Sequence, residues 1–219
     1  MIRQVSLEEI SDGRLYGLND MVKADCQDCT GCSACCRGMG QSIVLDPLDC
    51  FRLTRGLGQS METLMAGAVE LNVADGIILP NLKMNEQTGC CYYLGRDGRC
   101  TVHNLRPGIC RLFPLGRYYT EQSFRYFLQI RECRKENRTK VKVKKWIDMP
   151  EPARYEQYIS DWHYFLKACQ EHIGKSRDTA AAKRISMLVL TESYLRPYEN
   201  GTDFYPQFYR RLEDMKKSM

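Results

Sequence analysis

The chemistry of this chain is concentrated in its cysteines, which are most closely spaced in the stretch CTGCSACCRG that begins at Cys29. Four cysteines fall within eight residues there, and the last two, Cys35 and Cys36, are adjacent. The first three have the spacing C-x2-C-x2-C, which lets a short loop wrap thiolates around three corners of a cubic iron–sulfur cluster. A tetrahedral zinc site more simply takes two thiolates from each of two C-x2-C pairs. The spacing therefore favours iron–sulfur and leaves zinc open.

The adjacent pair Cys35 and Cys36 indicates more than one centre. Neighbouring side chains of an extended backbone point in opposite directions, so these two thiols would face two metal sites that share a wall. The alternative is that Cys36 is a small buried hydrophobic residue.

A second group of cysteines lies in residues 89–117, GCCYYLGRDGRCTVHNLRPGICRLFPLGR. Turns separate Cys91, Cys100 and Cys110, and turns can fold thiols that are distant in the chain into a common pocket. Cys133 follows a predicted hairpin and can close a site.

Two arginines, Arg106 and Arg111, flank Cys110. Because four-thiolate clusters carry net negative charge, guanidinium groups at these positions would offset that charge and donate hydrogen bonds to sulfur. The alternative for both is a surface ion pair. His103 is a candidate ligand for zinc or iron, although a lone histidine is more often a hydrogen-bonded structural residue.

Composition indicates that the thiols are kept reduced. The 219 residues are 43% hydrophobic, which is enough for a core without disulfides, yet the chain has 12 cysteines. Its start has no apolar signal segment, and no stretch approaches the length of a membrane span. We therefore expect a cytoplasmic protein with no membrane contact, whose cysteines bind metal. The net charge of +5 is too mild to indicate nucleic acid, so the expected partner is a protein or redox partner.

The elements that must position these thiols indicate an α+β fold, mostly helical and irregular, with two small β-hairpins and a helical C-terminal layer. A short helix is expected near the start, where Ser6 and Glu9 have the spacing of a capping box. A helix is expected after Asp46, which can cap it, with Gly56 as its end. A second helix is expected over residues 59–71.

The hairpins are expected at residues 77–94 and 117–130, where aromatic and β-branched residues flank turn residues. The alternating segment KVKVKKW from Lys140 reads as an exposed edge strand, or as a phosphate-binding strip.

The pattern of the sequence changes near Met149, where apolar residues at helical spacing begin. We therefore expect a cysteine-cluster metal-binding domain, 1–148, and a helical extension packed on it, 149–219. Helices are expected over 179–195 and 203–217. Apolar residues at helical spacing predict a buried stripe on an earlier helix, formed by Tyr155, Tyr158, Ile159, Trp162, Phe165, Leu166, Cys169 and Ile173.

The cysteine run, followed by CYYL at 91–94, CTVHNLRP at 100–107 and CRLFP at 110–114, resembles the CxxCxxCC family, also called YkgJ-type. That family is described as zinc- or iron-chelating or iron–sulfur-cluster proteins, and the resemblance covers about residues 26–135. The segment DPLDCFRL from Asp46 also resembles the helix that follows the family's cysteine run. The family pattern picks out eight thiols, enough for two four-thiolate sites: Cys29, Cys32, Cys35, Cys36, Cys91, Cys100, Cys110 and Cys133.

Four cysteines fall outside that pattern. Cys26 extends the run by another x2 step and could replace or supplement Cys29, and Cys90 could substitute for its neighbour Cys91. For Cys50 and Cys169, packing on helices is the expected role.

The resemblance implies metal chelation, and the cysteine spacing adds a preference for an iron–sulfur cluster (4Fe-4S favoured, one or two centres) for electron transfer or cluster-assisted chemistry. One alternative is a structural zinc module for interactions, which would lose its fold with a chelator. Another is a protein-modification enzyme, because a similar cysteine signature occurs in flagellin lysine N-methylases. Those proteins are longer, and the chain has no glycine-rich loop of the usual Rossmann type for S-adenosylmethionine.

Overall fold

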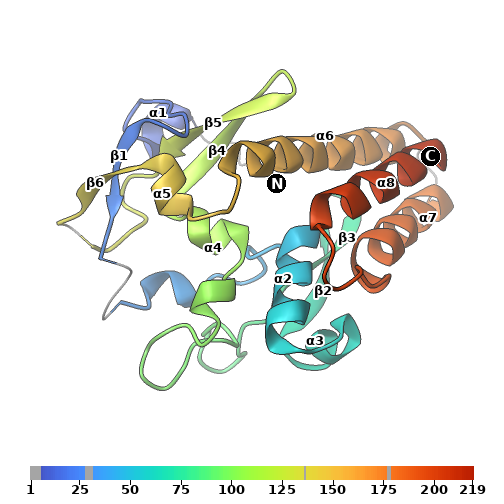
Figure 1. The fold of residues 1–219 in the computed structure, drawn as a ribbon, viewed down its shortest axis with the longest axis horizontal. Helices are drawn as coiled ribbons and strands as arrows, with labels where there is room; N and C mark the ends of the chain where they lie inside the picture. Colours follow the sequence, from blue (N-terminus) through green and yellow to red (C-terminus); the bar gives the residue numbers. More distant parts are fainter. Residues whose placement is uncertain (1–5, 28–31, 136, 177–178) are drawn as a thin grey trace.

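The computed structural model describes residues 6–27, 32–135, 137–176 and 179–219. Within them the fold is α+β, as the sequence predicts, with helices and small antiparallel sheets (Figure 1). Helices α6, α7 and α8 lie together on the right of the view, and the sheet of β1 and β6 lies on the left. No helix among the described residues is both long and apolar enough to cross a membrane.

Strands of the described residues pair in three two-stranded antiparallel sheets. The pairs are β1 (Met21–Asp25) with β6 (Thr139–Lys142), β2 (Val69–Ala74) with β3 (Ile77–Leu82), and β4 (Leu115–Thr120) with β5 (Ser123–Leu128). The β4–β5 hairpin is the one expected at 117–130. Its turn residues Glu121 and Gln122 both have positive φ, which suits the right-handed twist of a tight hairpin.

The first expected hairpin is displaced. Strand β3 pairs with β2 through a tight turn at Asp75 and Gly76, both with positive φ. The expected turn at 85–89 does form, but as a loop with a single bridge between Met84 and Cys91. The segment that begins at Lys140 is a strand only as far as Lys142, where α5 (Val143–Ile147) begins.

Helix α2 (Pro47–Leu57) begins as the sequence predicts. The side chain of Asp46 accepts a hydrogen bond from the Asp49 backbone, and Asp49 returns one to the Asp46 N–H, a reciprocal cap. The helix ends one residue beyond Leu57 at Gly58, which takes the left-handed conformation that glycine tolerates, and not at Gly56.

Two helix predictions need correction. Helix α3 (Met61–Gly67) is shorter than the expected 59–71, because Val69 and the residues after it pair with β3 instead. Helix α1 (Leu7–Ile10) forms, but the Ser6 side chain makes no capping hydrogen bond.

The C-terminal helices are α6 (Pro152–Ser176), α7 (Thr179–Leu190), continued by a π-helical turn η3 (Thr191–Leu195), and α8 (Phe204–Lys217). The predicted apolar stripe of α6 is core: Tyr158 meets Phe208 of α8 edge to face, with ring centroids 4.7 Å apart. A T-shaped contact of this kind adds to the free energy of simple burial. One continuous cluster of buried side chains runs from Tyr16 to Met215.

Candidate metal centre

Thiols from separate stretches of the chain line one cavity of about 100 Å³. A single water needs about 10–15 Å³ of such volume, so the space is large enough for several atoms. Of the described residues, the cysteines lining it are Cys32, Cys35, Cys36, Cys91, Cys100 and Cys110. The sequence prediction that the two cysteine groups share a pocket agrees with this arrangement.

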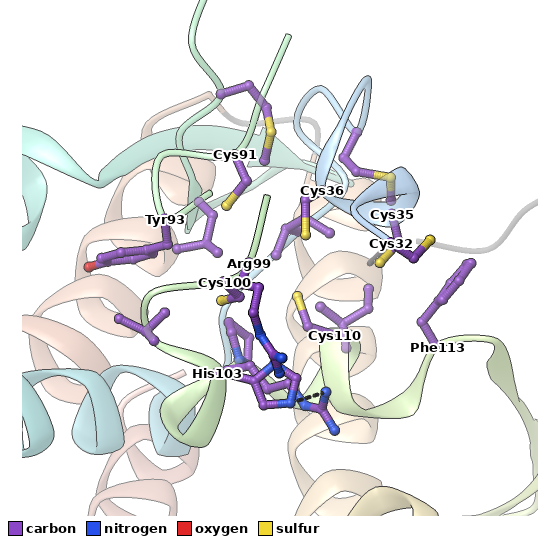
Figure 2. Close-up of a pocket in the computed structure, with 18 of the residues that line it drawn as sticks. Cys32, Cys35, Cys36, Cys91, Tyr93, Arg99, Cys100, His103, Cys110 and Phe113 are labelled. Atoms are coloured by element: carbon purple, nitrogen blue, oxygen red, sulfur yellow. Dashed lines mark hydrogen bonds between the residues drawn. The ribbon is translucent and has the colours of Figure 1, made fainter. Parts of the chain in front are cut away.

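The cavity has an inner group of thiols and an outer pair. Figure 2 shows the sulfur atoms of Cys36, Cys91, Cys100 and Cys110 around a common space. In the same view the Cys32 and Cys35 side chains lie to the right of that group. We call the first four the inner thiols.

The cysteine doublet does not have the extended backbone assumed from the sequence. Residues Ala34–Cys36 form a single 3-10 turn, η1, and Cys35 and Cys36 both line the cavity. After this turn the chain pairs with the second cysteine group, because the Cys91 N–H donates to the Cys36 carbonyl at 2.8 Å. The Gly38 N–H donates likewise to the Gly89 carbonyl at 2.8 Å. These backbone bonds fix Cys36 beside Cys91.

A compact turn brings Cys100 back to the same wall. The Gly95 N–H donates to the Arg99 carbonyl at 2.8 Å, and the Asp97 side chain accepts from the Arg99 N–H at 3.0 Å. A bridge then pairs Leu94 with Cys100. The segment GRDGRC is therefore the turn that the sequence indicates.

The third inner segment is α4 (Gly108–Leu112), which carries Cys110. The buried carboxylate of Asp49 accepts a hydrogen bond of 2.7 Å from the Gly108 N–H, so α2 holds the start of α4. Sequence reasoning missed this role of Asp49. The position of Asp49, three residues after the Asp46 cap, is a signal for the reciprocal cap alone, and nothing in the sequence indicates the bond to Gly108, 59 residues away.

Apolar side chains fill the rest of the wall and restrict water around the thiols. Met39, Ile43, Leu82, Phe113 and Trp146 all line the cavity. A low-polarity shell of this kind raises the cost of ionising a thiol, and it strengthens electrostatic interactions with any ion that is held there.

The thiols of the inner group keep their protons in the metal-free protein at neutral pH. Burial raises the pKa of Cys91, Cys100 and Cys110 above the ordinary value. The doublet is asymmetric, because a hydrogen bond from Cys36 lowers the pKa of Cys35, and the same bond raises that of Cys36. A metal ion that binds here must therefore displace protons.

Arg106 lies at the cavity, as expected, and Arg111 does not. Arg106 lines the cavity, and its positive charge opposes the effect of burial on the pKa of Cys100. The Arg111 side chain is buried elsewhere, where it donates to the carbonyls of Asn104, Arg106 and Asp148. On a helix the residue after Cys110 points about 100° away from it, so adjacency in sequence does not bring Arg111 to the cavity.

His103 also lines the cavity and is hydrogen-bonded. Its Nε2 lies 3.0 Å from the Arg106 Nη1. A guanidinium has no acceptor, so Arg106 donates and the Nε2 accepts. This contact favours the structural reading of His103 over its use as a ligand.

Two predicted ligands are not among the cysteines of the cavity described above. Cys133 does not line the cavity but lies near Cys26 and Cys32, whose charges act on its thiol. Cys29 lies outside the described residues.

None of the four cysteines outside the family pattern lines the cavity. Cys50 and Cys169 are buried in helices, as predicted. The Cys90 sulfur accepts a hydrogen bond of 2.9 Å from Arg37, a contact that the sequence did not indicate.

Among the described residues, no three Cys, His, Asp or Glu side chains close on one point tightly enough to hold an ion as they lie. The inner thiols instead surround a space, in a cavity that also carries the cationic Arg106. Thiolates are the donors that zinc and iron–sulfur clusters take. The donor set and the cationic neighbour therefore fit a thiolate-bound metal group.

Fold and site together define a small α+β protein built around a cavity of thiols. Residues 28–137, half of the chain, match the model of the CxxCxxCC family, described as "Putative zinc- or iron-chelating domain". The chain belongs to this family, and binding of zinc or iron by cysteine is its class of function. Searches of curated proteins and of solved structures found no match.

Proposed function

We propose that the protein carries an iron–sulfur cluster on the four inner thiols, Cys36, Cys91, Cys100 and Cys110, and acts in electron transfer. The observation that carries this proposal is the arrangement of four sulfur atoms, from three stretches of chain, around one enclosed space. A cubic cluster takes four thiolates, which is the number that surrounds this space. When bound, a cluster of this class supplies one-electron redox chemistry.

The residues of the chain supply three further conditions for that chemistry. The inner thiols ionise and ligate, the apolar wall excludes water, and Arg106 offsets negative charge beside Cys100. A surrounding of this kind sets the reduction potential through charge and solvent access.

Anaerobic purification, followed by assays of iron, zinc and acid-labile sulfide and by a visible spectrum, tests the proposal. We expect a brown protein with iron and sulfide in equal amounts and a broad absorbance that dithionite bleaches. A colourless protein with stoichiometric zinc and no sulfide would overturn it and support the structural zinc module. The alternative of a modification enzyme similar to the flagellin lysine N-methylases stays a prediction.

A further inference from the structure

A second group of thiols lies where the β1–β6 sheet ends. These strands run antiparallel with Asp25 opposite Thr139, and the Thr139 hydroxyl donates to the Asp25 carboxylate at 3.2 Å. In an antiparallel pair, the residue after one strand and the residue before its partner leave the ladder at the same end. Cys26 and Arg138 therefore emerge side by side, and Cys26 is buried.

Three further thiols lie close to Cys26. Burial raises the pKa of the Cys133 thiol, and the nearby Cys26 and Cys32 raise it further. Cys35 interacts with both groups, since the charge of Cys26 acts on it and its own charge acts on Cys91, Cys100 and Cys110. In Figure 2, Cys32 and Cys35 lie to the right of the inner thiols, with Cys35 next to Cys36. This second group thus has four members from two stretches of the chain, the cysteine run that Cys26 begins and the segment of Cys133.

Arg138 brings unused hydrogen-bond donors to this group. Within the described part of the chain, its Nε and Nη1 are buried and have no hydrogen-bond partner. Its positive charge acts on the Cys133 thiol, which places the guanidinium near the second group. A buried guanidinium with unmade hydrogen bonds is costly unless a negatively charged acceptor satisfies it. Thiolate and inorganic sulfide are acceptors of that kind, and both occur in an iron–sulfur centre.

We propose that Cys26, Cys32, Cys35 and Cys133 hold a second iron–sulfur centre, whose sulfur atoms accept hydrogen bonds from Arg138. The proposal rests on the proposed function for the class of metal group. It goes beyond the family match, which spans residues 28–137 and so includes neither Cys26 nor Arg138. The doublet Cys35 and Cys36 is then the wall between the two centres.

The test uses the full-length protein, purified without oxygen, with metal and sulfide counted per chain. Cys26→Ala and Cys91→Ala each remove one ligand, from the second and the inner group respectively, and each should lose about half of the metal and sulfide. Cys169→Ala is the matched control, because Cys169 is a buried cysteine assigned to neither group. It should keep the full content.

Two more variants keep the test decisive if Cys26→Ala does not fold. Cys133→Ala should deplete the same half, and Cys133 is less buried. Arg138→Met should keep both centres but lower the reduction potential of only one of them, because a cationic hydrogen-bond donor to that centre is lost. Full metal content in Cys133→Ala, or unchanged potentials in Arg138→Met, would overturn the second centre.

The outcomes also separate this proposal from the proposed function. Zinc in place of iron overturns the iron–sulfur function. If the zinc content is then halved by Cys133→Ala and separately by Cys91→Ala, two thiolate centres still stand. Iron and sulfide lost entirely in Cys91→Ala and untouched in Cys133→Ala would uphold the proposed function and overturn the second centre.

Discussion

The doublet of Cys35 and Cys36 gives the sharpest test at the scale of single residues. The Cys36 carbonyl is bonded to Cys91, whereas the Cys35 thiol, whose charge also acts on the inner thiols, interacts with Cys26 as well. We therefore expect Cys35→Ser to deplete the second centre and Cys36→Ser the inner one. Electron paramagnetic resonance of the reduced variants would show which signal each has lost. Loss of the same signal from both would exclude a shared wall.

A second prediction at this scale concerns Arg106, whose charge lies beside Cys100. A hydrogen bond to a charged group contributes about 1.5 kcal/mol or more, and 1.4 kcal/mol corresponds to about 59 mV in a one-electron couple. Arg106→Met should therefore lower the reduction potential of the inner centre by on the order of 60 mV without loss of iron. Protein-film voltammetry measures this, with the exposed Arg210→Gln as control. An unchanged reduction potential would mean that Arg106 does not interact with the inner centre.

The sequence predicted that Cys91, Cys100 and Cys110 share a pocket, because turns separate them. It did not predict that Cys36, and not the C-x2-C-x2-C run, lies with them. The direction in which a side chain points could not be predicted from the sequence. Arg106 and Arg111 look equivalent around Cys110, but the helix turns Arg111 toward the carbonyls of Asn104 and Asp148. The 3-10 turn at the doublet was missed for the same reason, since its backbone is set by tertiary pairing with the second cysteine group.

At the scale of elements, α4 is held in place by contacts to α2 and α6. A Cβ atom on Gly108 would collide with the Tyr155 hydroxyl of α6. Gly108→Ala should therefore destabilise the protein by about 1–3 kcal/mol, the usual cost of overpacking. Urea unfolding of the metal-loaded protein measures the loss.

The double variant Gly108→Ala/Tyr155→Phe is the control for that prediction. Removing the hydroxyl relieves the collision, although Tyr155 also gives up the bond that it accepts from Arg117 at 3.0 Å. The double variant should be more stable than the sum of the two single effects predicts. Strictly additive losses would mean that the collision is not what destabilises Gly108→Ala.

Helices that begin at capping residues could be predicted from the sequence. Strands whose formation depends on pairing with another segment could not. Asp46 and Pro47 mark the start of α2, and the structure begins the helix there. Val69–Ala74, by contrast, continues a helical pattern but becomes β2, because its partner Ile77–Leu82 lies across a tight turn. The β1–β6 sheet was missed because more than a hundred residues separate its strands.

At the scale of the whole molecule, the metal-binding segments and the helical layer differ in what holds them together. Residues 83–113 contain only the short helices η2 (His103–Leu105) and α4 and isolated bridges. Helix α6 instead packs its aromatic stripe against α8. A ligand that binds only the folded state contributes its binding free energy to folding. In this protein we expect the metal to stabilise mainly residues 83–113, which have little regular secondary structure.

Removal of the metal should therefore loosen the molecule unevenly. After treatment with a chelator, hydrogen–deuterium exchange should rise strongly in residues 83–113 and little in α6. Hydrogen exchange reports such local opening, because each segment opens with its own free energy. A uniform rise across both segments would mean that the metal holds the entire fold.

Metal retention should also depend on pH, in a direction that the thiols determine. Burial raises the pKa of Cys91, Cys100 and Cys110, so the metal-free protein holds these protons at neutral pH. Ligation needs thiolates, so binding releases protons, and affinity rises with pH until the raised pKa values are passed. As pH falls, protons compete with the metal for the thiolates, and the metal is lost. For each proton that binding releases, the affinity for metal falls by up to about tenfold per pH unit. Titration of metal content between about pH 5.5 and 8.5 measures this, and a flat profile would show that the ligands are not these buried thiols.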